Sequence, residues 1–148
     1  MKPAARILSL GLAVYSAAWF VQVIRDGSTL ADGVLPGWEA FRAALSPIWP
    51  IDGDTYFEGW RGLLSVISAF TNLIVLSLPL WLRLATRHRT ARAAVPLWLA
   101  AAVDAHWMVG FLQELRWGYF MWCGSFVILA FGVARFAKPA PSLGSTAA

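Results

Sequence analysis

Apolar residues gather in four long stretches, at about residues 7–24, 63–82, 95–115 and 118–134. A transmembrane helix needs about 20 mostly apolar residues to cross the hydrocarbon core of a bilayer. Because lipid cannot hydrogen-bond to the backbone, each stretch is predicted to be an α-helix. The strands of a membrane barrel would alternate apolar and polar residues, and these stretches do not. The pattern predicts an all-α, polytopic integral membrane protein in which residues 1–138 form a four-transmembrane-helix bundle.

The first stretch has a second interpretation, a cleaved signal peptide. It follows the basic residues Lys2 and Arg6, and Ser16-Ala17-Ala18 resembles a cleavage site. The apolar run nevertheless continues past these residues and ends only at Arg25. Since the apolar region of a signal peptide is only about 7–15 residues long, this length favours an uncleaved membrane anchor.

The only long connection, residues 25–62, joins the first and second stretches. Within residues 35–45, the apolar residues Trp38, Phe41 and Leu45 recur at helical spacing. A short helix with one apolar face can lie in the plane of a membrane interface. We therefore predict an amphipathic interfacial helix in this loop.

The connections fall into two groups by charge. The flanks of the bundle and the connection between the second and third stretches carry only basic residues, namely Lys2, Arg6, Arg83, Arg87, Arg89, Arg92, Arg135 and Lys138. The remaining connections carry both signs, namely Arg25, Asp26, Asp32, Glu39, Arg42, Asp52, Asp54, Glu58, Arg61 and Arg116. The positive-inside rule places the first group in the cytoplasm. We predict a multi-pass protein of the plasma (inner) membrane of a bacterium, with both termini cytoplasmic and residues 139–148 as a disordered tail.

The composition favours lipid as the main partner. Hydrophobic residues make up 59% of the 148 residues and charged residues 14%, and the mean hydropathy is +0.61. Soluble domains contain about 25% charged residues. The net charge of +4 does not indicate nucleic-acid binding, because the basic residues are divided among short connections. The single cysteine, Cys123, cannot form an internal disulfide.

Asp104 and His106 are the most unusual residues, since both fall near the middle of the third stretch. A carboxylate at that depth costs about 2.5–3.5 kcal/mol on insertion scales, which makes it a candidate functional residue. Two positions on a helix are about 200° apart, so these two side chains face different directions. Asn72 and Ser125 lie at similar depth in the second and fourth stretches. We predict an intramembrane polar layer of Asn72, Asp104, His106 and Ser125.

This polar layer has two interpretations. It has a function, as a proton or ion relay or as a buried ligand site, or it is a set of interhelical hydrogen bonds worth about 0.6–2 kcal/mol each. The second interpretation predicts a small non-catalytic protein, an accessory, assembly or pore-forming subunit that forms homo-oligomers or joins a membrane complex. The first predicts an oligomeric ion- or proton-coupled transporter or channel. An enzyme is disfavoured, because one Asp and one His on opposed faces make a poor acid–base pair.

The basic residues Arg87, Arg89 and Arg92 are candidate contacts for anionic lipid headgroups. Each cation near a membrane surface contributes about 1 kcal/mol to such binding, although the topology alone explains their presence. The two histidines, His88 and His106, lie at different levels of the membrane. No metal centre and no cofactor are predicted, because zinc sites need several converging ligands.

Overall fold

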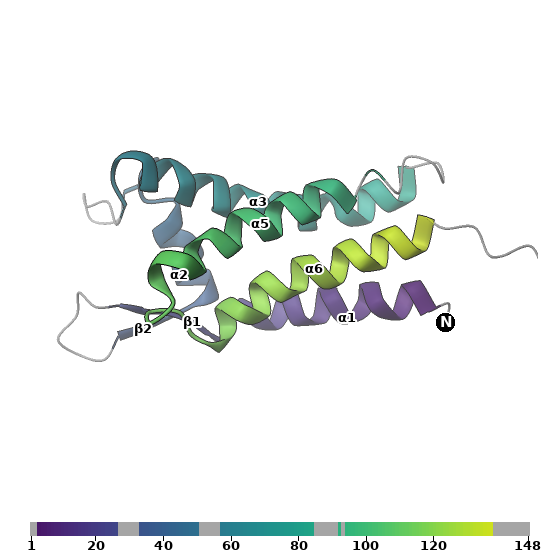
Figure 1. The fold of residues 1–148 in the computed structure, drawn as a ribbon, viewed down its shortest axis with the longest axis horizontal. Helices are drawn as coiled ribbons and strands as arrows, with labels where there is room; N and C mark the ends of the chain where they lie inside the picture. Colours follow the sequence, from purple (N-terminus) through teal and green to yellow (C-terminus); the bar gives the residue numbers. More distant parts are fainter. Residues whose placement is uncertain (1–2, 27–32, 51–56, 85–91, 93, 138–148) are drawn as a thin grey trace, which may run out of the picture.

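The computed structural model describes residues 3–26, 33–50, 57–84, 92 and 94–137. Four long helices lie side by side in an elongated bundle (Figure 1), namely α1 (Pro3–Ala18), α3 (Gly59–Leu84), α5 (Ala94–Phe111) and α6 (Trp117–Ala137). Three short elements gather at one end of it, namely β1 (Gln22–Asp26), β2 (Gly33–Pro36) and α2 (Gly37–Ala44). We call this the sheet end. Proline stands in the first turn of α1 and of α5, where a missing N–H breaks no helical hydrogen bond.

Three of the described helices, α3, α5 and α6, are long and apolar enough to cross a membrane. They contain 26, 18 and 21 residues, which at 1.5 Å per residue gives about 39, 27 and 32 Å. The hydrocarbon core of a bilayer is about 30 Å thick. These helices coincide with the second, third and fourth predicted spans, and the prediction of apolar helices of membrane length is confirmed for them.

The first predicted span differs from the structure. Helix α1 ends at Ala18, and the apolar residues that follow enter β1, which pairs antiparallel with β2. A continuous helix over residues 7–24 is therefore wrong after Ala18, and the all-α prediction omitted this two-stranded sheet. Val21, Val23 and Ile24 are β-branched residues that suit extended backbone. This segment also has backbone hydrogen-bond partners outside a helix, since the carbonyl of Val21 accepts a hydrogen bond from the N–H of Gly37 at 3.2 Å.

Helix α5 is also shorter than the predicted third span, which extended to residue 115. It ends at Phe111, and the next residues run alongside β1. Arg25 N–H donates to Glu114 O at 2.7 Å, and Arg116 N–H donates to Val23 O at 2.8 Å. These bonds satisfy backbone groups that a longer helix would have satisfied internally.

Helix α2 lies inside the predicted 35–45 segment. It buries its small residues, Gly37, Ala40 and Ala43. Phe41 packs against Trp19, with ring centroids 5.2 Å apart, whereas Trp38 is 53% exposed. The helix therefore sits against the bundle on one side and presents Trp38 on the other, and its position relative to a membrane interface stays a prediction.

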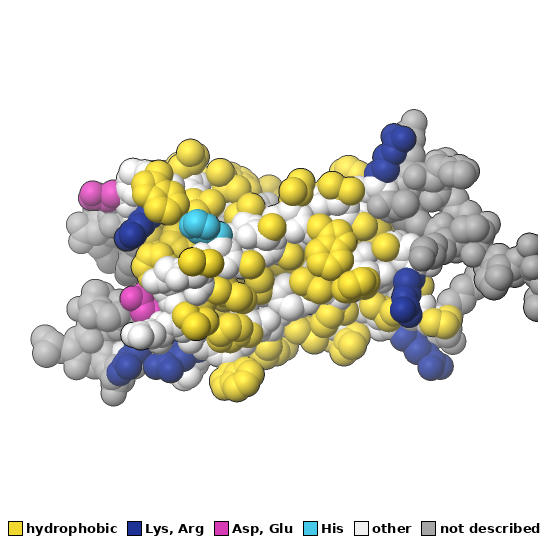
Figure 2. Space-filling model, in the orientation of Figure 1, with side chains coloured by type: hydrophobic (Ala, Val, Ile, Leu, Met, Phe, Trp, Pro, Cys, Tyr) yellow, Lys and Arg dark blue, Asp and Glu magenta, His cyan; other side chains and the backbone are white. Residues whose placement is uncertain are grey.

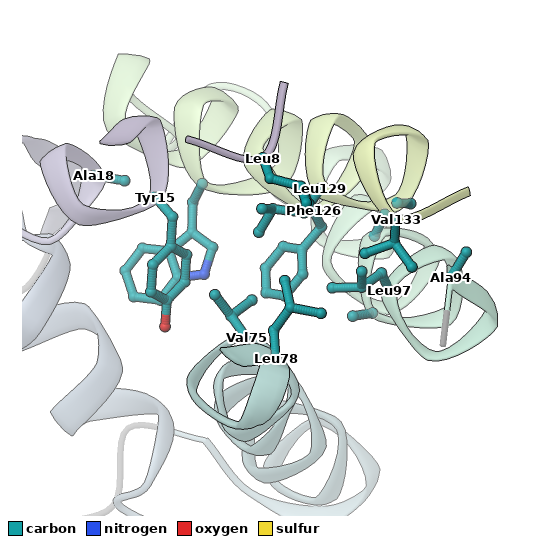
Figure 3. Close-up of a cluster of buried hydrophobic side chains, with 14 of the residues drawn as sticks. Leu8, Tyr15, Ala18, Val75, Leu78, Ala94, Leu97, Phe126, Leu129 and Val133 are labelled. Atoms are coloured by element: carbon teal, nitrogen blue, oxygen red, sulfur yellow. The ribbon is translucent and has the colours of Figure 1, made fainter. Parts of the chain in front are cut away.

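Helices α1 and α6 pack antiparallel and close together. A Cβ at Gly11 would lie 2.8 Å from Leu129, and one at Gly132 would lie 2.8 Å from Leu8. Small residues allow such close approach between apolar helices. The core fills the space between this pair and α3 and α5, and Figure 3 shows the buried side chains converging there, including Leu8, Val75, Leu78, Leu97, Phe126, Leu129 and Val133.

Charged side chains gather at the two ends of the bundle, with an apolar band between them (Figure 2). The described charged residues near the sheet end carry both signs, namely Arg25, Glu39, Arg42, Glu58, Arg61, Glu114 and Arg116. Those near the opposite end are all basic, namely Arg6, Arg83, Arg92 and Arg135. The described members of the two charge groups thus lie at opposite ends of the bundle. Residues 139–148 lie outside the described part of the chain.

Candidate functional site

A cavity of about 210 Å³ lies inside the sheet end, between β1, α2, α3, α5 and α6. Much of its wall is apolar, and six lining residues are aromatic, namely Phe41, Phe57, Trp107, Phe111, Tyr119 and Trp122. Among its polar and acidic lining residues, Ser65, Asn72 and Asp104 are buried and Ser68 is half-buried. Arg25 and Glu114 belong to the same wall and are exposed, so they mark its rim.

Asp104 is the acidic group of this cavity, and it is only 3% exposed. The hydroxyl of Ser68 donates to Oδ1 of Asp104, and the hydroxyl of Thr71 lies 3.3 Å from Oδ2. Ser68 and Thr71 are three residues apart on α3, so they share one helix face. From α6, the hydroxyl of Tyr119 donates to the backbone carbonyl of Asp104 at 2.6 Å. One residue of α5 is therefore tied to both neighbouring helices.

Asn72 takes part in a separate set of contacts. The hydroxyl of Tyr15 donates to Oδ1 of Asn72 at 2.9 Å, which links α1 to α3. The Asn72 amide donates back to the carbonyl of Ala69, also at 2.9 Å. Asn72 lines the same cavity as Asp104, but the bonds above attach it to α1 and not to the carboxyl.

Ser125 and His106 do not join these groups. Ser125 is fully buried and donates to the carbonyl of Trp122 in its own helix at 2.6 Å. His106 is exposed on the outer face of α5, where Figure 2 shows the histidine on the surface. Its ring lies edge-on to Trp60, with centroids 5.9 Å apart. The four residues of the predicted polar layer therefore do not form one network, because the rotation of α5 that buries Asp104 turns His106 outward.

The opposite half of the bundle is apolar inside. Beyond the level of Ser125, the described side chains that are buried between the helices are hydrocarbon or aromatic, and Figure 3 shows most of them: Leu8, Val75, Leu78, Leu97, Leu129 and Val133. In the described part of the chain, the buried polar contacts are thus confined to the middle and the sheet end.

The predicted lipid-contact cluster is only partly described. Arg92 is exposed just before α5, at the end opposite the sheet, while Arg87 and Arg89 lie outside the described residues. Among the residues that the structure describes, no three His, Cys, Asp or Glu side chains are close enough together to hold a metal ion.

Sequence reasoning did not identify Tyr15, Ser68, Thr71 and Tyr119 as partners of the buried polar residues. One signal was present, because Ser68 and Thr71 stand on one face of a largely apolar helix. The two tyrosines give no such signal, since Tyr is expected near membrane interfaces anyway. Their role depends on how the helices pack.

The fold and the site together describe a helical membrane-type bundle with an internal, largely apolar cavity at one end. No known protein family matches the chain, and no curated protein or solved structure is significantly similar to it. The function of the cavity and of the outer faces is therefore inferred from their own geometry.

Proposed function

We propose that this chain is a small non-catalytic protein of the plasma (inner) membrane that acts as an accessory or assembly subunit through helix packing. The observation that carries the proposal is the exposed face of α5. Ala102, His106, Val109 and Gly110 are exposed there at helical spacing. Small residues let a second helix approach closely, and an imidazole facing lipid gains from a polar partner on such a helix.

The contacts of Asp104 support a non-catalytic role. Its carboxyl accepts a hydrogen bond from Ser68 on α3, and its backbone carbonyl accepts one from Tyr119 on α6. Hydrogen bonds of this kind between membrane helices contribute about 0.6–2 kcal/mol each. In this proposal the costly intramembrane acid is retained because it fixes the packing of three helices.

The proposed topology has four crossings, with the basic end of the bundle in the cytoplasm. Helix α1 has 16 residues, about 24 Å by helical rise, and it runs antiparallel along α6. The extended residues after Ala18 then carry the chain over the remaining few ångströms of a core about 30 Å thick. The positive-inside rule orients the bundle so that both termini are cytoplasmic. Helix α2 lies in the outer interface, with Trp38 at headgroup level.

The alternative is an ion- or proton-coupled transporter or channel. Its support is the buried carboxyl of Asp104 in the cavity wall. Against it, Leu97, Leu129 and Val133 belong to an apolar interior in the opposite half of the described bundle. An ion path through a single chain would therefore require this apolar half to open. Otherwise the ion path would have to run between copies of the chain.

Two glycine variants test the subunit proposal in native membranes. A Cβ at Gly110 on α5 or at Gly124 on α6 would meet nothing within 4 Å in this chain. Gly110→Leu and Gly124→Leu therefore make the same change on two open surfaces, and only the first alters the proposed docking face. The tagged wild-type chain should migrate on native gels as a complex larger than a monomer, the Gly124 variant should match it, and the Gly110 variant should dissociate.

Equal behaviour of the two variants, or a wild-type chain that is monomeric in native membranes, would contradict the subunit proposal. Purified protein in proteoliposomes tests the alternative. Ion flux by this chain alone that disappears in Asp104→Asn would support transport. Absence of flux in both proteins, together with the complex described above, supports the accessory role.

A further inference from the structure

The hydroxyl donors of the cavity wall are already used within the protein. Ser65 lies 2.8 Å from the carbonyl of Gly62 and 2.9 Å from that of Ala44. Ser68 donates to Asp104, and Tyr119 donates to the backbone of the same residue. Since a hydroxyl has a single hydrogen to donate, these groups hold none in reserve for a ligand.

At Asp104 itself, the spare hydrogen-bonding capacity is that of an acceptor, Oδ2. The hydroxyl of Thr71 lies 3.3 Å from this oxygen. That hydroxyl is closer to the carbonyl of Ser68, at 2.6 Å, and its one hydrogen goes to the nearer acceptor. An ionised carboxyl has about four lone-pair sites. A ligand that reaches Asp104 is therefore one that donates a hydrogen bond.

The charge of the cavity also favours a cationic ligand. Its wall contains two carboxyl groups, Asp104 and Glu114, and one guanidinium, Arg25. Arg25 and Glu114 are at the exposed rim, whereas Asp104 is buried. A buried carboxylate is costly unless a cation is placed next to it. A positive charge entering from the rim would offset that cost.

The aromatic side chains of the wall suit the same kind of ligand. Phe57 and Phe111 each pack against Trp107, with ring centroids 5.3 and 5.5 Å apart. Aromatic faces attract ammonium groups, more strongly where water is excluded. The apolar remainder of the wall, including Leu35 and Leu115, would contact hydrocarbon. The cavity, at about 210 Å³, is smaller than the roughly 300–1,000 Å³ of drug-sized sites.

We infer that this cavity binds a small lipophilic amine in its protonated form, with the ammonium group donating to Oδ2 of Asp104 and the hydrocarbon part against the aromatic wall. A primary arylalkylamine with one aromatic ring has the required size, charge and donors. This inference goes beyond the proposed subunit role, and it does not depend on the exposed face of α5.

Binding of 2-phenylethylamine to the purified full-length protein in lipid nanodiscs tests the inference, with 2-phenylethanol as the neutral probe of the same shape. Wild-type protein should bind the amine at least about tenfold more tightly than the alcohol, the difference expected for a charge-assisted hydrogen bond. Asp104→Asn should abolish this preference and leave binding of the alcohol unchanged. Glu114→Gln, the matched change at the rim, should keep most of the preference.

Equal affinity of the wild-type protein for amine and alcohol, absence of binding, or an unchanged preference in Asp104→Asn would overturn the inference. Ala69→Leu provides a second variant in case Asp104→Asn does not fold. Ala69 lines the cavity and is buried, so the larger side chain should occupy the space and prevent binding of both probes. Retained binding in that variant would place the amine elsewhere.

Discussion

Gly118 is the position at which a single methyl group should test the architecture of the sheet end. It lies in the first turn of α6, directly against β1. A Cβ there would lie 2.6 Å from the carbonyl oxygen of Gln22 and 3.0 Å from its carbonyl carbon. These are backbone atoms of a paired strand, so they cannot move aside as the end of a flexible side chain can. Gly118→Ala therefore requires β1 and α6 to separate.

The size of the effect follows from the distances. Ordinary contact begins at 3.4 Å, so the oxygen and the new Cβ must separate by about 0.8 Å. Overpacking of this kind costs about 1–3 kcal/mol. Replacing glycine by alanine within a helix raises the free energy of unfolding by about 0.5–1 kcal/mol. The gain at Gly118 is smaller, because this residue is close to the helix start. We expect Gly118→Ala to lower the free energy of unfolding by about 1–2 kcal/mol.

Gly110→Ala is the matched control, because a Cβ at Gly110 meets nothing within 4 Å in this chain. Gly110→Ala should change only the helix propensity and raise the free energy of unfolding by up to about 1 kcal/mol. Both variants are compared with the wild type by unfolding in mixed micelles at increasing SDS, followed by circular dichroism and tryptophan fluorescence. Equal stability of the two variants would refute the close approach of β1 to α6, and with it the placement of β1 beside the cavity.

Three further predictions concern the buried polar contacts and the topology. Asp104→Asn should retain most of the stability of the wild type in the same SDS titration, whereas Asp104→Leu, which leaves the hydroxyl of Ser68 without its acceptor, should lose about 1–3 kcal/mol; similar losses for both would contradict the hydrogen-bonding role. Tyr15→Phe should cost about 0.5–1.5 kcal/mol through the lost bond to Asn72, and an unchanged midpoint would count against that contact. In a Cys-free background, an impermeant maleimide added to intact cells should label Ile48→Cys, which is 62% exposed near the sheet end, and not Arg92→Cys; the reverse result would invert the topology.

The long helices were predictable because their signal is local. An apolar run of about 20 residues has few alternatives in any fold, and the predicted span 63–82 lies within Gly59–Leu84. The need of Asp104 for polar partners was predictable for a similar reason, because the cost of a carboxyl in hydrocarbon is a property of the residue and its depth. Neither prediction required knowledge of the neighbouring helices.

The remaining features depend on partners that are distant along the chain. Val23 and Ile24 are apolar enough for a membrane helix, and they become a strand because β2 and the segment around Leu115 supply hydrogen bonds. Helical geometry predicts that Asp104 and His106 diverge, but not which of them faces inward. That choice follows from the packing of α5 against α3, where Ser68 meets the carboxyl.

The side chains between α1 and α6 differ in size at the two ends of the pair. Toward the opposite end, Gly11 and Gly132 let the two helices approach so closely that an added Cβ would overlap its neighbours. Toward the sheet end, Tyr15, Trp19 and Trp122 stand between them, with ring centroids 4.9–6.1 Å apart. The cavity begins beside Trp122, which shares its wall with residues of β1, α2, α3 and α5. The close glycine contacts thus lie in the apolar half of the bundle, and the aromatic rings lie in the half where Asp104 lines the cavity.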